Sequence, residues 1–258
     1  MLIANLLPSP LLFRLKKSYY VRAVQSFWEA DTEPMKYLVK AGDFVLDIGA
    51  NVGWYTRILA ALVGEQGKVY SIEPIPETFK LLSAVIQKLC FKNVHPINCA
   101  VSEKDGCAFM EVPLYDHGAP NFYQSRIVGN ERATHPVRQY KVDVRSIDSL
   151  FLELSQSITF IKCDVEGHEL SVIKGAFHFF LKSKPAWLIE ISGNPDDDSG
   201  SSKDVFKHLR DQNYTPYWFD GRRLKKHSPG DKAINYFFLQ RSHLGQLGPM
   251  GVHLERDD

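Results

Sequence analysis

Short apolar runs alternate with longer stretches of helical periodicity over most of the chain. Residues 44–48, 68–73 and 160–164 form short runs rich in β-branched and aromatic residues, which is typical of buried strands. Residues 54–63 and 77–89 place their apolar side chains at the spacing of a helix. Strands that alternate with helices predict a parallel sheet whose strands are joined by crossover helices.

The same rhythm continues on both sides of these segments. We predict further strands at residues 94–101 and 187–190 and a helix at residues 170–181, and helical stretches at residues 11–28 and 33–40 precede the first strand. Residues 1–41 therefore form an N-terminal helical extension, residues 42–241 the main domain, and residues 242–258 a flexible tail.

The C-terminal part of the main domain has a different pattern. Residues 217–219 and 222–224 are separated by Asp220-Gly221, a dipeptide typical of hairpin turns. Residues 234–239 predict one more strand. Antiparallel strands at one end of a mostly parallel sheet are the expected result.

Residues 113–139 interrupt the rhythm between two predicted strands at residues 108–112 and 140–144. The interval is rich in Gly, Pro, Asn, His and Arg, and long irregular segments inside compact domains are usually functional. We expect it to form part of a substrate pocket or a lid over one.

Composition and charge narrow the class of partner. The 258 residues are 44% hydrophobic and 24% charged, as in globular proteins. Lys and Arg number 31 against 30 Asp and Glu, so the chain lacks the basic excess that drives nucleic-acid binding. A small-molecule partner is favoured and a nucleic-acid partner is not expected.

Cysteine spacing and apolar runs bear on the compartment. The four cysteines form no C-x-x-C pair, so we expect reduced packing residues. The uncharged run at residues 1–13 contains Pro8 and Pro10 and is shorter than the ~18–20 residues of a transmembrane helix. We expect a cytoplasmic protein without a transmembrane segment, and a loose contact of this run with a membrane surface stays open.

A glycine-containing turn follows the first predicted strand. Its sequence, from Asp47 to Gly53, places Gly49, Asn51 and Gly53 where backbone must approach a ligand closely. Glu73 ends the second strand, 20 positions after Gly53, which suits a carboxylate that accepts hydrogen bonds from both ribose hydroxyls of an adenosine. The two signals together predict an adenosine site, and Trp54 at the third glycine position of the dinucleotide fingerprint weakens an NAD-binding interpretation.

Charged side chains stand at the ends of two later strands. Lys162, Asp164 and Glu166 follow one another at every second position, and ligands bind beyond the carboxyl ends of parallel strands. Glu190 ends the next strand, so Asp164 and Glu190 are expected to present paired carboxylates. The candidate catalytic residues are therefore Asp164, Glu190 and Lys162. A divalent ion on these carboxylates is a lesser alternative, and no metal ligand is assigned.

The motifs resemble the FkbM family of S-adenosylmethionine-dependent methyltransferases. The resemblance rests on the Asp47–Gly53 turn with Tyr55-Thr56, on Glu73-Pro74, on Ala100-Val101-Ser102 and above all on the Ile161–Glu169 stretch. It implies a class I methyltransferase fold, a Rossmann-like three-layer α/β sandwich with a mostly parallel seven-stranded sheet and an antiparallel C-terminal strand or hairpin. It also implies S-adenosylmethionine as cofactor.

The resemblance assigns parts of the cofactor to particular residues. Gly49, Asn51 and Gly53 would line the methionine end, Glu73 the ribose, and Val101 and Ser102 the adenine. The full candidate set for cofactor binding is Asp47, Gly49, Asn51, Gly53, Tyr55, Thr56, Glu73, Val101, Ser102 and Asp164.

The expected activity is O-methylation of a hydroxyl on a small-molecule or carbohydrate-like acceptor. Two alternatives stay open at this point: an NAD-type oxidoreductase, and a non-catalytic module that binds adenosine, because a fold alone does not fix an activity.

Overall fold

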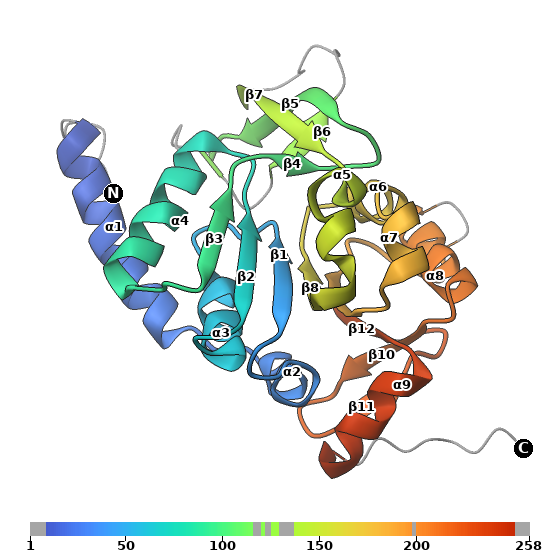
Figure 1. Ribbon diagram of the computed structural model, residues 1–258. Helices are drawn as coiled ribbons and strands as arrows, with labels where there is room; N and C mark the ends of the chain where they lie inside the picture. Colours follow the sequence, from blue (N-terminus) through green and yellow to red (C-terminus); the bar gives the residue numbers. More distant parts are fainter. Residues whose placement is uncertain (1–8, 116–119, 122–124, 129–136, 198–199, 251–258) are drawn as a thin grey trace, which may run out of the picture.

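The structure is a computed structural model that describes residues 9–115, 120–121, 125–128, 137–197 and 200–250 (Figure 1). Within these residues an eight-stranded sheet forms the centre, in the order β11-β10-β12-β9-β8-β1-β2-β3. Its strands are β1 (Phe44–Ile48), β2 (Lys68–Ile72), β3 (Val94–Ile97), β8 (Ile158–Cys163), β9 (Ala186–Glu190), β10 (Thr215–Phe219), β11 (Leu224–Lys226) and β12 (Asn235–Leu239).

The directions of the strands confirm the predicted topology. Strands β3, β2, β1, β8 and β9 pair in parallel. Strand β12 is antiparallel to both of its neighbours, β9 and β10, and β11 pairs antiparallel with β10 across the Asp220-Gly221 turn. The seven expected strands are present, and β11 adds an eighth at the edge.

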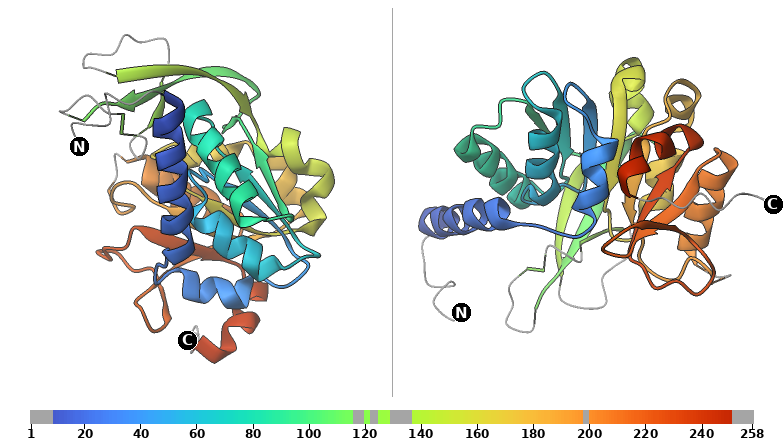
Figure 2. Two further views of the ribbon diagram at one scale, coloured as in Figure 1. Left: turned by 90° about the vertical axis from the view of Figure 1, so that its left-hand side faces the viewer. Right: turned by 90° about the horizontal axis from the view of Figure 1, so that it is seen from below.

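Helices cover both faces of the sheet, which makes the three expected layers (Figures 1 and 2). One face carries α2 (Thr32–Leu38), α3 (Trp54–Val63) and α4 (Pro76–Leu89), and the other carries α5 (Ile147–Phe151), η3 (Leu152–Ser157), α6 (Glu169–Lys174), α7 (Phe177–Lys182) and α8 (Ser201–Asp211). Successive strand residues point to opposite faces, so Val45 packs in the first of these layers and Leu46 in the second.

The two ends of the described chain pack on this core. Helix α1 (Ser9–Ser26) lies against α4, where its Val24 is buried with Leu81 and Val85. Residues 241–250, most of which we expected in a flexible tail, instead form α9 (Arg241–Leu244) and η4 (Gly245–Met250), because Leu247 is buried in the α2 layer. No described helix has the length and apolar character needed to cross a membrane.

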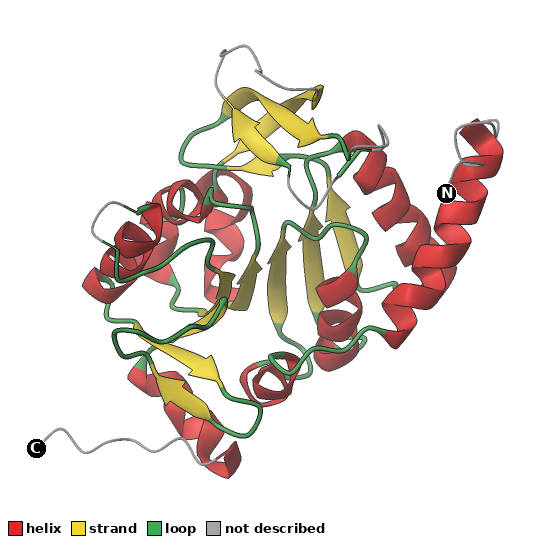
Figure 3. Cartoon of the chain, turned by 180° about the vertical axis from the view of Figure 1, so that it is seen from behind, coloured by secondary structure: helices red, strands yellow, loops and turns green. Residues whose placement is uncertain are grey.

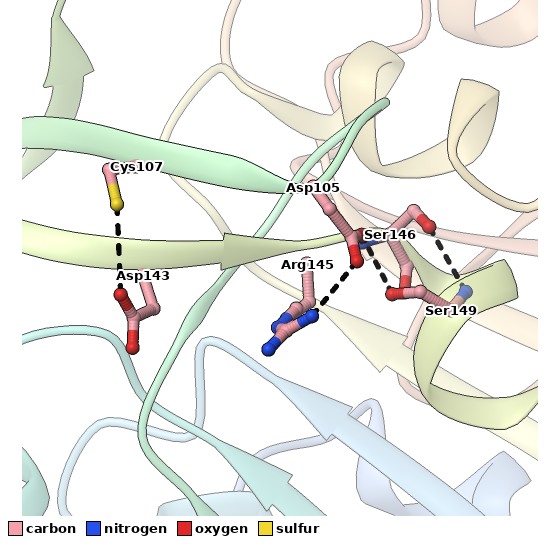
Figure 4. Close-up of polar contacts among 6 residues, drawn as sticks. All are labelled: Asp105, Cys107, Asp143, Arg145, Ser146 and Ser149. Carbon is pink, nitrogen blue, oxygen red and sulfur yellow. Dashed lines mark hydrogen bonds and ion pairs between the residues drawn. The ribbon is translucent and has the colours of Figure 1, made fainter.

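A second, smaller sheet stands at one end of the main sheet (Figure 3). Its strands are β4 (Ala100–Val101), β5 (Gly106–Pro113), β6 (Arg126–Val128) and β7 (Val137–Arg145), in the order β4-β7-β5-β6. Asp105 ties this sheet to α5 by accepting hydrogen bonds from the Ser146 backbone at 2.8 Å, the Ser149 hydroxyl at 2.7 Å and Arg145 at 3.1 Å (Figure 4).

One predicted strand is divided between the two sheets. The strand predicted at residues 94–101 is β3 in the main sheet followed by β4 in the second sheet. The chain turns between them because the Asn98 amide donates to the carbonyls of Glu73 and Pro74, at 2.8 and 3.0 Å.

The irregular segment predicted at residues 113–139 is shorter than expected. Residues 126–128 form β6, and residues 137–139 already belong to β7. Residues 116–119, 122–124 and 129–136 of this segment lie outside the described part of the chain.

The helix predicted at residues 170–181 is divided at Gly175 into α6 and α7. Gly175 has an ordinary φ of −72°, so its backbone conformation does not require glycine. A Cβ atom there would lie 2.1 Å from the Ser102 carbonyl oxygen, so the requirement is space for the backbone that follows β4.

We therefore expect Gly175→Ala to destabilise the fold by about 1–3 kcal/mol, the usual cost of inserting a methyl group into a packed interior. The thermal midpoint should fall by several degrees, at ~2–4 °C per kcal/mol for a chain of this size. Gly245→Ala is the matched control, because its Cβ atom would meet nothing within 4 Å. Equal midpoints for the two variants in a thermal melt would contradict this account of Gly175.

Candidate functional site

A cavity of about 450 Å³ lies at the carboxyl ends of β1, β2, β8 and β9. Its volume lies within the range of small-molecule sites, and its position is where ligands bind in open α/β sheets. The lining residues come from the strand ends, from the segment before α2 and from the second sheet: Phe27, Glu29, Asp47, Ile48, Gly49, Ala50, Asn51, Trp54, Tyr55, Ile72, Glu73, Pro74, Cys99, Ala100, Val101, Met110, Ser125, Ile127, Lys162, Asp164, Val165, Glu166, His168 and Glu190.

The turn after β1 approaches the backbone that follows β8. A Cβ atom on Gly49 would lie 1.8 Å from the Asp164 carbonyl oxygen, so only glycine fits there. Asn51 has a left-handed φ of 50°, which asparagine tolerates better than most residues. Gly53 has a φ of 100° at the start of α3 and does not line the cavity. Gly49 therefore presents bare backbone at the cavity wall.

Glu73 is held at the end of β2 by two backbone donors. The N–H groups of Asn51 and Ile75 donate to its two carboxylate oxygens, at 3.1 and 2.9 Å. Each oxygen keeps one further lone pair, so the carboxylate has two acceptor positions left for a ligand. Burial raises the pKa of Glu73 to about 7, against the lowering effect of the two backbone hydrogen bonds.

Asp47 lies at the end of β1 and also lines the cavity. Thr56 donates to its carboxylate, and the Thr56 hydroxyl is 2.9 Å from the Ser71 hydroxyl on β2. Burial raises the pKa of Asp47 to about 6, although the Thr56 hydrogen bond and the Lys162 charge lower it. Thr56 itself is buried behind Asp47 and is not part of the cavity wall, so it acts on the site through Asp47.

Lys162 is a buried cation among carboxylates. Its side chain is 1% exposed, its ammonium lies 3.9 Å from an Asp164 oxygen, and it has no hydrogen-bond partner among the described residues. Its ammonium also lies 5.0 Å from the centre of the Tyr55 ring. Burying an ammonium is costly unless it is compensated, and here the carboxylates and the aromatic ring supply that compensation.

The predicted pair of carboxylates is present. The pKa of Glu190 is raised, first by burial and then by the charge of Asp164, and Glu190 shares a hydrogen bond with Asp164. Glu166 follows in a left-handed turn, with a φ of 52°, and burial raises its pKa to about 7. No group of three His, Cys, Asp or Glu side chains in the described ranges forms a metal-ligand set.

Glu169 and His168 have different functions at the start of α6. Glu169 is the first residue of α6, and its carboxylate accepts the Gly167 N–H at 2.8 Å. His168 lines the cavity, and its Nε2 atom lies 2.9 Å from the Ser102 hydroxyl. Ser102 does not line the cavity, whereas Val101 beside it does.

Several cavity residues carry no signal in the sequence. Tyr55 was a candidate, but its partner Glu29, which accepts the Tyr55 hydroxyl, was not. Phe27 packs on Trp54 and Tyr55, with ring centres 5.2 and 5.6 Å apart. No local pattern marks these contacts, because they arise from the packing of the N-terminal extension on α3. Met110 and Ile127 reach the cavity from the second sheet, whose strand order the sequence did not predict.

Comparison with known proteins agrees with this geometry. A family model described as the methyltransferase FkbM domain matches residues 47–216, about two thirds of the chain. A protein-L-isoaspartate O-methyltransferase from Methanococcus aeolicus is 39% identical over 110 residues, which are 41% of this chain and 51% of that protein. One from Methanocella arvoryzae is 38% identical over 56 residues, or 22% of this chain and 30% of that protein. The chain thus spans about a third to a half of the length of these relatives.

Two solved structures are also similar to this chain. The methyltransferase FkbM from Methylobacillus flagellatus KT gives a TM-score of 0.49 at 21% identity and covers 76% of this chain and 43% of its own. A SAM-dependent methyltransferase from Aquifex aeolicus gives 0.45 at 19% identity, covering 82% and 88%. Since the family match runs from the end of β1 to β10 and includes the cavity residues at the ends of β1, β2, β8 and β9, the chain belongs to the methyltransferase FkbM domain family, whose cofactor is S-adenosylmethionine.

Proposed function

We propose that this chain transfers the methyl group of S-adenosylmethionine to a hydroxyl of a small, sugar-like acceptor. The observation that carries the proposal is one cavity with two ends, in which Glu73 lies at the β2 side and the Asp164 and Glu190 pair lies at the β8 and β9 side. The first end suits a nucleoside, and the second suits the proton of an acceptor hydroxyl.

The residues at the first end fit the cofactor. Gly49 and Asn51 expose backbone for the methionine end, and the two remaining lone pairs of Glu73 match the two ribose hydroxyls. Val101 provides an apolar wall for the adenine, while Ser102 supports that wall through His168. Asp47, with Thr56 behind it, and Tyr55 complete the proposed set, and Gly53 shapes the turn.

The residues at the second end suit proton transfer. When bound, S-adenosylmethionine supplies an activated methyl group, and the chain need mainly align the acceptor and exclude water. We assign Asp164 as the acceptor of the hydroxyl proton. Glu190, whose pKa is raised by burial and by the Asp164 charge, shares a hydrogen bond with Asp164, and Lys162 keeps the Asp164 carboxylate in place.

The charge of the cavity supports the acceptor class. Carboxylates of Glu29, Asp164, Glu166 and Glu190 line this side, and ionised carboxylates accept hydrogen bonds from hydroxyl groups. The same charges repel phosphate, which disfavours a nucleic-acid acceptor. Ile127 lines the cavity from the segment between β5 and β7, which supports the proposal that this segment contacts the acceptor.

The cofactor assignment is tested by thermal shift with S-adenosylmethionine, S-adenosylhomocysteine and NAD at equal concentrations. A ligand at ~100 times its Kd adds ~2.7 kcal/mol to the free energy of unfolding, so the midpoint should rise by several degrees with the first two ligands. Glu73→Ala should weaken their binding by roughly 10- to 150-fold, the loss of ~1.5–3 kcal/mol for hydrogen bonds to a charged group. A larger shift with NAD would refute the cofactor assignment.

The pKa of Glu73 gives the affinity a pH dependence of known sign. Below about 7 the Glu73 carboxyl is protonated in the empty site, and the ribose hydroxyls prefer the carboxylate. Binding therefore releases a proton, and the Kd for S-adenosylhomocysteine should fall as the pH rises toward 7 and then level off. Calorimetry in two buffers of different ionisation enthalpy measures that proton. In Glu73→Gln the proton release at this site should disappear, and its persistence would assign the titration to another carboxyl.

Asp164→Asn separates binding from chemistry. We expect cofactor affinity to stay within a few-fold of the wild type, while the rate of methyl transfer falls by ~10²–10⁴, the usual contribution of a proton acceptor. Single-turnover kinetics with a hydroxylated acceptor measure the rate. Full turnover by the variant would remove Asp164 from the reaction. A non-catalytic module would be favoured if the wild type binds the cofactor but transfers no methyl group to any of a panel of acceptors.

A further inference from the structure

Helix α1 presents an apolar stripe to the outside of the molecule. Leu11, Leu15 and Tyr19 lie four residues apart, so they share one face of the helix. Their exposed fractions are 41%, 52% and 66%, and Trp28 just beyond the helix is 67% exposed. Three large side chains therefore face outward along α1, and a fourth is exposed just beyond its end.

The opposite face of α1 fixes this orientation. Val24 is fully buried against Leu81 and Val85, and the Tyr20 and Trp54 rings have centres 6.2 Å apart. The helix thus lies along α4 at the periphery of the fold, away from the main sheet (Figures 1 and 2). Packing of the inner face accounts for one apolar side of the helix but leaves the outer stripe unexplained.

The charges on α1 have a single sign. Arg14, Lys16, Lys17 and Arg22 lie on α1, and residues 1–28 contain no Asp or Glu. Arg14 and Arg22 are exposed beside the stripe, and none of the four cations forms an ion pair with a described residue. Residues 1–28 thus carry a charge of +4, whereas the whole chain carries only +1.

We infer that the outer face of α1 docks on the surface of an anionic lipid bilayer. Leucine and aromatic side chains between arginines and lysines are the composition of helices that lie in the plane of a membrane interface. Tyr and Trp favour the headgroup level, and long basic side chains extend their charges to lipid phosphates while their stems stay in apolar surroundings. A second copy of the chain is disfavoured as the occupant, because two such faces would bring like charges together.

Vesicle co-sedimentation of the full chain tests this inference. Vesicles of an equimolar mixture of phosphatidylcholine and phosphatidylserine should pellet the protein, and vesicles of phosphatidylcholine alone should not. Each basic residue near an anionic surface contributes about fivefold to the partition coefficient, so Arg14→Glu with Arg22→Glu should reduce it by about 25-fold or more. Added salt should reduce the binding as well, because it screens these charges.

Matched variants test whether the vesicles bind the outer face of α1 or any exposed apolar or basic surface. Leu15→Asp with Tyr19→Asp should abolish pelleting, whereas Phe177→Asp with Leu181→Asp, at similarly exposed positions on α7, should not. Arg222→Glu with Lys226→Glu is the charge control on the C-terminal hairpin. All of these side chains are exposed, so the thermal midpoints of the variants should match that of the wild type.

Three results would overturn the inference. The first is no pelleting with the anionic vesicles at low salt. The second is equal loss of binding in the α1 variants and in their controls. The third is a dimer in gel filtration that Leu15→Asp with Tyr19→Asp converts to a monomer, which would assign the stripe to a second copy of the chain.

Discussion

The contact between the turn after β1 and the backbone after β8 sets the geometry of the whole site. Gly49 lies so close to the Asp164 carbonyl that no side chain fits between them. The Asp164 N–H donates to the Ile48 carbonyl at 3.0 Å, so two adjacent parallel strands end in register at this point. This close approach puts backbone from one strand and the carboxylate from the next at the same cavity wall.

Electrostatics imposes the second constraint. Six carboxyl groups line the cavity, from Glu29, Asp47, Glu73, Asp164, Glu166 and Glu190. The described lining residues include one lysine, Lys162. Burial raises the pKa of several of these groups, so part of the cluster carries protons at neutral pH. An array of this kind favours ligands that bring hydroxyl donors or positive charge, and S-adenosylmethionine carries a sulfonium.

The sequence was informative where a strand or a motif fixes the geometry locally. Asp47, Gly49 and Glu73 follow from the turn and from strand ends, and the Asp164 and Glu190 pair follows from adjacent parallel strands. Long-range packing left no such signal. Glu29 reaches Tyr55 because the N-terminal extension packs on α3, and the strand-like sequence of residues 94–101 conceals the turn that Asn98 stabilises. Helical periodicity likewise continues across Gly175, where backbone contact with Ser102 ends the helix.

The residues of the cavity wall come from separate parts of the chain. Its nucleoside end is built by the sheet and the turns that follow β1 and β2, whereas Phe27 and Glu29 come from the segment before α2 and Met110 and Ile127 from the second sheet. Under the proposed function, Phe27, Glu29 and Ile127 are therefore the positions at which to alter acceptor specificity, because they line the cavity from outside the central sheet.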